Sequence, residues 1–339
     1  RMRKAHPVNP KTIDSYVEAR FHLDQASAAD FYNGKQQFKK DETTKALFYL
    51  DQAVREDPSY VPAYVAYFDL VDAPGLSRME FVPKAQAALR RALEVDESNV
   101  AAHLALGRLL LQFEYDWAGA GKEYQRAIQL APESGPAHYD YSEYLAMLGR
   151  NDDADKERDL AQALDPSHDY FFDAGVNRLD HTVEQDRQAL EEKSPNDPYA
   201  LGSLAKLYAT QHRYEDAVQL WQRCLALYGW DEYAQLLKQA DARGGPEFAL
   251  EEWMRAVELR SKSHDDFPVF VPALTYSALG NKDRAFAWLD KAVAQRNWCI
   301  IYMRRMRGWK VGGESFDDWE ALRSDQRFAA LLHRVGLPE

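Results

Sequence analysis

Residues 100–132, VAAHLALGRLLLQFEYDWAGAGKEYQRAIQLAP, contain the pattern that decides the fold. Ala120, Tyr124 and Ala127 are spaced by four and then three positions, which places all three on one face of a helix. Small residues at both ends of that face let a second helix approach closely around one bulky side chain. An apolar helical segment precedes this stripe, and Pro132 follows it as a stop signal. The stretch therefore predicts a hairpin of two antiparallel helices.

The stripe of a small residue, a bulky residue and a second small residue recurs along the chain with a period of about 34 residues. Its other copies are Ala46/Leu50/Ala53, Ala85/Leu89/Ala92, Ala217/Trp221/Cys224, Ala249/Trp253/Ala256, Ala285/Leu289/Ala292 and, as a polar variant, Ala154/Arg158/Ala161. One gap of nearly two periods predicts a degenerate copy within residues 167–197. We also expect both stripe tryptophans to be buried between helices.

Together with the Leu-Gly and Tyr positions of the preceding helix and the terminal proline, these stripes resemble tetratricopeptide repeats. The resemblance covers roughly residues 28–295 and implies an all-α fold, a right-handed superhelical solenoid of about eight helical hairpins with no sheet. Residues 1–27 are expected to form an entry segment and helix, and residues 296–339 a connector and a C-terminal capping helix. An irregular α-α array of related superhelical type is the alternative.

The two ends carry a narrower resemblance. Residues 6–21 (HPVNPKTIDSYVEARF) and 319–338 (WEALRSDQRFAALLHRVGLP) are similar to the flanks of the repeat region in large bacterial signalling proteins. In those proteins a winged-helix DNA-binding domain or a Ser/Thr kinase domain, often with a TolB-like segment, precedes the repeats. The resemblance implies the sensory or docking half of such a protein. The chain opens at Arg1 without an initiator methionine, so we expect a processed product or an excised fragment.

The composition narrows the classes of partner. A net charge of −12 opposes non-specific attraction to nucleic acid or to an anionic membrane surface. The longest apolar run, residues 104–111, is far shorter than the ~20 residues of a membrane helix, so no membrane insertion is expected. Cys224 and Cys299 lie in apolar stretches and are expected to be buried thiols. The compartment stays open between the cytoplasm and, if an upstream segment spans a membrane, an extracytoplasmic location.

The sequence contains no signature of catalysis. The common phosphate-loop, dinucleotide, zincin and hydrolase motifs do not occur, so we expect no enzyme activity, no catalytic residue and no cofactor. Residues 153–157 (DADKE) resemble part of a calcium loop, but Arg158 stands where the sharp turn needs glycine. His103 and His138 occupy equivalent places in adjacent hairpins, where packing is the favoured role over a metal site. No metal is therefore predicted.

Function is expected from the shape of the fold, because the first helices of stacked hairpins line an extended concave groove. We expect that groove to bind a protein or peptide partner as an extended or helical segment. The helix register places these residues in it: Asp69, Arg108, Tyr139, Glu143, Tyr199, Lys206 and Lys238.

Two alternatives stay open beside the groove. The run that contains Arg304, Arg305, Arg307 and Lys310, next to Trp309, is the strongest basic cluster and is an alternative contact surface. The second alternative is self-assembly, a homo-oligomer or filament built by end-to-end contacts between terminal hairpins.

Overall fold

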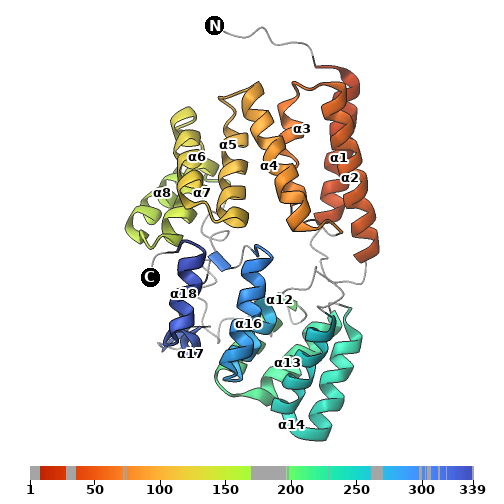
Figure 1. The fold of residues 1–339 in the computed structure, drawn as a ribbon, viewed down its shortest axis with the longest axis vertical. Helices are drawn as coiled ribbons and strands as arrows, with labels where there is room; N and C mark the ends of the chain where they lie inside the picture. Colours follow the sequence, from red (N-terminus) through yellow and green to blue (C-terminus); the bar gives the residue numbers. More distant parts are fainter. Residues whose placement is uncertain are drawn as a thin grey trace. The chain divides into compact units, whose positions relative to one another are not determined.

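The computed structural model describes residues 8–27, 36–71, 73, 75–168, 196, 198–227, 229–260, 270–297, 300–301, 303, 307–311, 314–317 and 319–337 (Figure 1). The chain divides into two compact units within α7. The N-terminal unit comprises Arg1–Phe31 and Lys35–Tyr141, and the C-terminal unit comprises Tyr32–Gly34 and Ser142–Glu339.

The N-terminal unit consists of paired helices. Its elements are α1 (Pro10–Ser27), α2 (Gln36–Glu56), α3 (Val61–Val65), the 3-10 helix η1 (Phe68–Leu70), α4 (Arg78–Val95), α5 (Val100–Leu109), the π-helical turn η2 (Leu110–Glu114), α6 (Trp117–Leu130) and the start of α7 (Gly135–Met147). Side chains cap the N-termini of α5 and α6: Asn99 accepts a hydrogen bond from the Ala102 amide, and Asp116 accepts one from the Gly119 amide.

The C-terminal unit continues the pairing. Its elements are the end of α7, α8 (Asn151–Leu164), α12 (Pro198–Thr210), α13 (Tyr214–Leu227), α14 (Asp231–Arg260), α15 (Phe270–Ala278), α16 (Lys282–Ala294), β1 (Arg307–Val311), β2 (Glu314–Asp317), α17 (Glu320–Arg323) and α18 (Gln326–Arg334). The last helix buries Phe328, Leu331 and Leu332, in agreement with the predicted capping helix.

Element α14 is a helical hairpin. Gly245, at φ 83° and ψ 177°, breaks the helix, and a positive φ of this kind favours glycine. The two ends of α14 lie close together, because Arg260 pairs with Glu232 and its guanidinium lies 5.8 Å from the ring centre of Tyr233. The described residues therefore contain seven hairpins, and the predicted degenerate copy lies in a segment almost wholly outside them.

The predicted stripe is the packing face of the second helix in each described hairpin. All of its small residues are at most 1% exposed except Ala256, which is half-buried. Its bulky positions are buried too, including Trp221, Trp253 and the polar variant Arg158. Cys224 is buried as predicted, while Cys299 lies outside the described residues. The stripe and the all-α hairpin fold are thus confirmed.

One side-chain hydrogen bond recurs at the turn between successive hairpins. Tyr64, His103 and His138 occupy equivalent positions in α3, α5 and α7, and each reaches the backbone carbonyl six residues earlier. The distances from Tyr64 Oη to Pro58 O, His103 Nε2 to Glu97 O and His138 Nε2 to Pro132 O are 3.2, 3.1 and 3.0 Å. A carbonyl can only accept, so both histidines donate from Nε2. The two buried histidines thus link the start of each hairpin to the turn before it, a role that the sequence analysis did not specify.

His103 makes stability depend on pH. Burial lowers its pKa, but the hydrogen bonds to the Glu123 carboxylate and to the Glu97 carbonyl outweigh burial and the nearby Arg126, so the pKa of His103 is raised. The protonated form is therefore favoured by folding, and its contribution is complete below the ordinary pKa of about 6.5. We expect this contribution to disappear as pH rises through the raised pKa. Urea titrations across that range should show the fall in stability in the wild type and not in His103→Gln.

The C-terminal connector differs from the prediction, which allowed no sheet. Strands β1 and β2 pair antiparallel, with Val311 opposite Glu314 and Lys310 opposite Ser315. The sequence places Gly312 and Gly313 between the strands, and a Gly-Gly pair between two short runs is a recognised hairpin signal. The prediction missed it because the segment was interpreted as a basic connector.

Candidate functional site

Four charged side chains alternate in sign across the first helices of the four hairpins α1 to α8. We call this set, Arg20, Asp69, Arg108 and Asp140, the charge ladder; its members come from α1, η1, α5 and α7. Arg20 Nη1 lies 2.5 Å from Asp69 Oδ2. Arg108 holds Asp140 in a bidentate pair, with Nε–Oδ2 and Nη2–Oδ1 both at 2.8 Å. Arg108 also acts electrostatically on the Asp69 carboxyl, which joins the two pairs.

Three members of the ladder are partly exposed. The side chains of Arg20, Asp69 and Arg108 are 41, 45 and 39% exposed, so water reaches each of them. Even so, burial raises the pKa of Asp69 against the opposing effects of Arg20 and Arg108. Burial also works to lower the pKa of Arg108, although Asp140 outweighs it and the pKa is raised. Asp69 and Arg108 are therefore accessible to water and still partly desolvated by the surrounding protein.

Two of the predicted groove residues, Asp69 and Arg108, are thus brought together in the N-terminal unit. Tyr139 joins them, because it adjoins Asp140, is half-buried and contributes to the electrostatic field at Arg108. The prediction missed Arg20 and Asp140. Arg20 lies in the segment interpreted as an entry helix, and Asp140 is only 6% exposed, so neither stood out as a groove residue.

Removing the carboxylate of Asp140 should destabilise the N-terminal unit by about 1–2 kcal/mol. The loss is that of a bidentate, charge-assisted pair, reduced because the Arg108 left behind can reach water. Asp69→Asn is the matched comparison, since its pair with Arg20 is more exposed and should cost under about 1 kcal/mol. Denaturant titration of Asp140→Ala and Asp69→Asn measures both, and equal losses would contradict the assignment of Arg108–Asp140 as the structural pair.

Glu143, another predicted groove residue, has a charged neighbour in its own hairpin, and binding by it stays a prediction. Its side chain is 14% exposed, and its Oε1 lies 3.9 Å from Nη2 of Arg158, which is 4% exposed. Arg158 occupies the bulky position of the stripe in α8, so the carboxylate of Glu143 faces its own hairpin. The register took no account of a buried arginine that needs a counter-charge.

The remaining predicted groove residues belong to the C-terminal unit. Lys206 lies at a shallow recess that is lined by Trp221, Leu274 and Thr275 among others. Lys238 is exposed in the first half of α14. Tyr199 lies in α12, but its side chain is outside the described residues. Binding by these three residues stays a prediction.

The alternative basic surface is only partly described. Arg307 and Lys310 are in strand β1, whereas Arg304 and Arg305 fall outside the described residues. Among the residues that the structure describes, no three His, Cys, Asp or Glu side chains are grouped to hold a metal ion. Within the same residues, no helix has both the length and the apolar character needed to cross a membrane.

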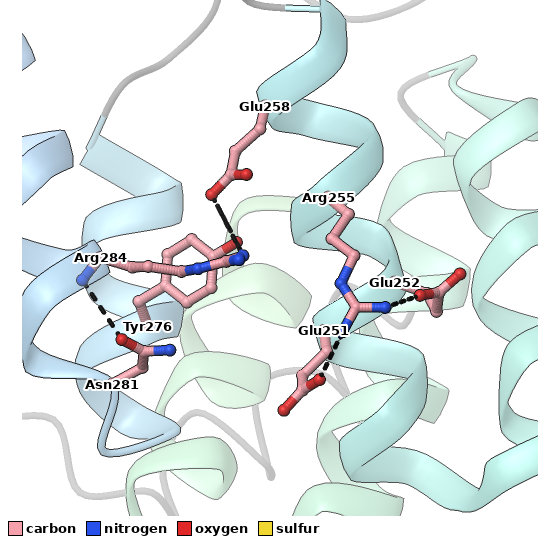
Figure 2. Close-up of polar contacts among 7 residues, drawn as sticks. All are labelled: Glu251, Glu252, Arg255, Glu258, Tyr276, Asn281 and Arg284. Carbon is pink, nitrogen blue, oxygen red and sulfur yellow. Dashed lines mark hydrogen bonds and ion pairs between the residues drawn. The ribbon is translucent and has the colours of Figure 1, made fainter.

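The C-terminal unit contains a polar network that joins three helices (Figure 2). Tyr276 of α15 donates to Glu258 of α14 at 2.7 Å and accepts from Arg284 of α16 at 2.9 Å. Burial, together with the Glu258 carboxylate, raises the pKa of Tyr276 to about 12, so the phenol stays protonated and keeps donating. Nearby, Arg255 pairs with Glu251 and Glu252 along the exposed face of α14. The network therefore links α14 to the next hairpin, which is formed by α15 and α16.

The close contact between α5 and α6 shows how the two helices of a hairpin pack. Gly107 faces Tyr124 so closely that a Cβ atom added to the glycine would lie 2.7 Å from the tyrosine Cε1. The predicted Leu-Gly position of the first helix thus lies directly against the bulky stripe position of the second helix. In this contact the hairpins resemble tetratricopeptide repeats. Their recurrence through both units gives the chain its fold.

Comparisons with known proteins give partial likenesses to this chain. No protein-family model matches it. Protein O-mannosyl-transferase Tmtc2 from Drosophila melanogaster is 33% identical over 76 residues, which are 22% of this chain and 8% of that protein.

Among solved structures, PilW, a type IV pilus biogenesis factor, is 14% identical with a TM-score of 0.34, and the match covers 84% of this chain and 94% of PilW. MamA is 16% identical with a TM-score of 0.28, over 58% of this chain and 94% of MamA. YrrB, described as a TPR protein with an unusual peptide-binding site, is 17% identical with a TM-score of 0.25, over 73% of this chain and 91% of YrrB.

Proposed function

We propose that this chain is a non-catalytic protein-interaction scaffold, and that the surface around the charge ladder in the N-terminal unit holds a segment of a protein partner. The observation that carries the proposal is the charge ladder itself, in which charges of both signs from four successive first helices are joined by ion pairs while Arg20, Asp69 and Arg108 stay 41, 45 and 39% exposed. Charges that are held in place and reachable from solvent can orient a charged or polar ligand.

The surface offers both signs of charge and an aromatic ring within one unit. Arg108 and Asp69 can orient a partner backbone or side chains of either sign, and Tyr139 adds apolar contact area. Because the ladder is internally paired, it adds specificity and orientation more than raw affinity. We therefore expect modest affinity and a clear dependence on ionic strength. The resemblance of the chain's two ends to bacterial signalling proteins supports a docking role within a larger protein.

The proposal is tested with peptides selected from a displayed random library against the full chain. We expect Asp69→Lys, which places a third positive charge beside Arg20 and Arg108, to weaken the selected peptides by about tenfold or more. Asp159→Lys is the matched control, because Asp159 is an exposed acid on the second helix α8. Thermal melts of both variants check that each one is still folded when its affinity is measured. Equal peptide affinity for Asp69→Lys and wild type would overturn the proposed surface.

A further inference from the structure

Helix α1 exposes a stripe of three large apolar side chains. Ile13, Val17 and Phe21 are 43, 57 and 55% exposed. They are spaced at four and eight positions, so they lie one above the other on a single face. The core-facing apolar residues of the same helix, such as Ala19 and Leu23, are at most 4% exposed, so the stripe does not belong to the core. We call these three residues the α1 stripe.

The α1 stripe borders the charge ladder. Arg20 follows Val17 by three positions, which makes the two neighbours on the helix surface. Arg20 reaches from there to Asp69 in η1 and lies 3.7 Å from Asp24. The stripe is therefore continuous with the surface to which the proposed function assigns binding.

Carboxylates lie along one edge of the stripe and at one end of it. Asp14 and Glu18 lie along one edge, Asp24 lies three positions beyond Phe21 on the same face, and all three are exposed. Arg20, the cation nearest to the stripe, already pairs with Asp69 and Asp24. An occupant of the stripe therefore meets an apolar centre with carboxylates along one edge and at one end.

We infer that the α1 stripe binds the apolar face of a basic amphipathic helix of a partner protein, an inference that rests on the proposed function. A helix with apolar residues at successive turns matches the four-residue spacing of the stripe, which extends over about 12 Å or two turns. Lysine or arginine residues beside that apolar face would meet Asp14, Glu18 and Asp24. A second copy of this chain fits less well, because pairing two α1 stripes would bring the same carboxylates together.

The test uses two synthetic probe peptides, an amphipathic helix of leucine and lysine and its counterpart of leucine and glutamate, with the full chain. We expect the wild type to bind the leucine–lysine peptide and not the leucine–glutamate peptide in fluorescence anisotropy. Val17→Gln together with Phe21→Gln should weaken binding by about tenfold, since glutamine keeps the helix propensity and removes the apolar area. Phe48→Gln is the matched control, because Phe48 is 56% exposed on α2 outside the stripe, and it should change affinity by less than about twofold.

Charge is tested separately with Glu18→Gln together with Asp24→Asn, which should weaken binding and flatten its salt dependence. Equal binding by the stripe double variant and the wild type, or preference for the leucine–glutamate peptide, would overturn the inference. If sedimentation shows that the wild type is a dimer and the stripe double variant is a monomer, the stripe serves self-association, and this result would overturn the inference as well. If library-selected peptides lose affinity with Asp69→Lys but the stripe variant binds the probe normally, the proposed function stands and this inference fails.

Discussion

Replacing Trp253 by alanine should lower the free energy of unfolding by about 3–5 kcal/mol, the largest effect that we expect from a single substitution. Trp253 is 1% exposed, and its ring lies 5.0 Å from that of Trp221 at an angle of 53°. The substitution removes a large buried surface, leaves a cavity between α13 and α14, and abolishes the contact between the two rings. Urea titration followed by circular dichroism measures the loss.

Trp253→Phe is the control for this prediction. Among the described residues, Nε1 of Trp253 has no hydrogen-bond partner, so phenylalanine removes an unsatisfied donor while it keeps an aromatic ring. We expect it to cost clearly less than alanine. A loss below about 1 kcal/mol for Trp253→Ala would mean that the α13–α14 packing is not as described.

Gly107→Ala should destabilise the N-terminal unit by about 1–3 kcal/mol, although alanine is the better helix former. The added Cβ would lie 2.7 Å from Tyr124 Cε1 and 3.0 Å from Cδ1. Tyr124 is 1% exposed, so its ring cannot turn aside into solvent. Either α5 must move away from α6 or the ring must leave its rotamer, and both cost packing.

Gly202→Ala is the matched comparison in α12. A Cβ at Gly202 would lie 3.4 Å from Cys224 Sγ, an ordinary contact, so the intrinsic helix preference should leave stability unchanged or raise it by up to about 1 kcal/mol. The melting temperatures of both variants show whether the loss at Gly107 comes from overpacking against Tyr124 or from replacing any helical glycine by alanine. If Gly107→Ala is as stable as Gly202→Ala, the close α5–α6 crossing is refuted.

The sequence predicts the repeat because packing between adjacent helices requires a local pattern. Ala120, Tyr124 and Ala127 lie within two helical turns, and their burial follows from that spacing alone. The hairpin within α14 could also be predicted, since Ala249 and Trp253 repeat the pattern beyond the Gly244–Gly245 pair. The equivalent positions of His103 and His138 in adjacent hairpins could be read from the sequence, but their hydrogen bonds to the turn carbonyls could not.

The site was harder to predict, because its contacts join residues far apart in the sequence. The register placed Asp69 and Arg108 on one surface, but it gave no reason to choose Arg20, which is 49 residues before Asp69. The register also gave no sign that Glu143 lies near the buried Arg158, which had been interpreted only as a polar variant of the stripe. Long-range ion pairs of this kind depend on how hairpins stack, which no local spacing specifies.

Hydrogen–deuterium exchange of the full chain, with and without a saturating library-selected peptide, tests the central claim most directly. The account predicts slower exchange in α1, the α3–η1 segment, α5 and the start of α7, where the α1 stripe and the charge ladder lie. Amides elsewhere should exchange as in the free chain. Protection confined to α12–α16 or to the β1–β2 hairpin, or a selection that yields no binding peptide, would contradict it.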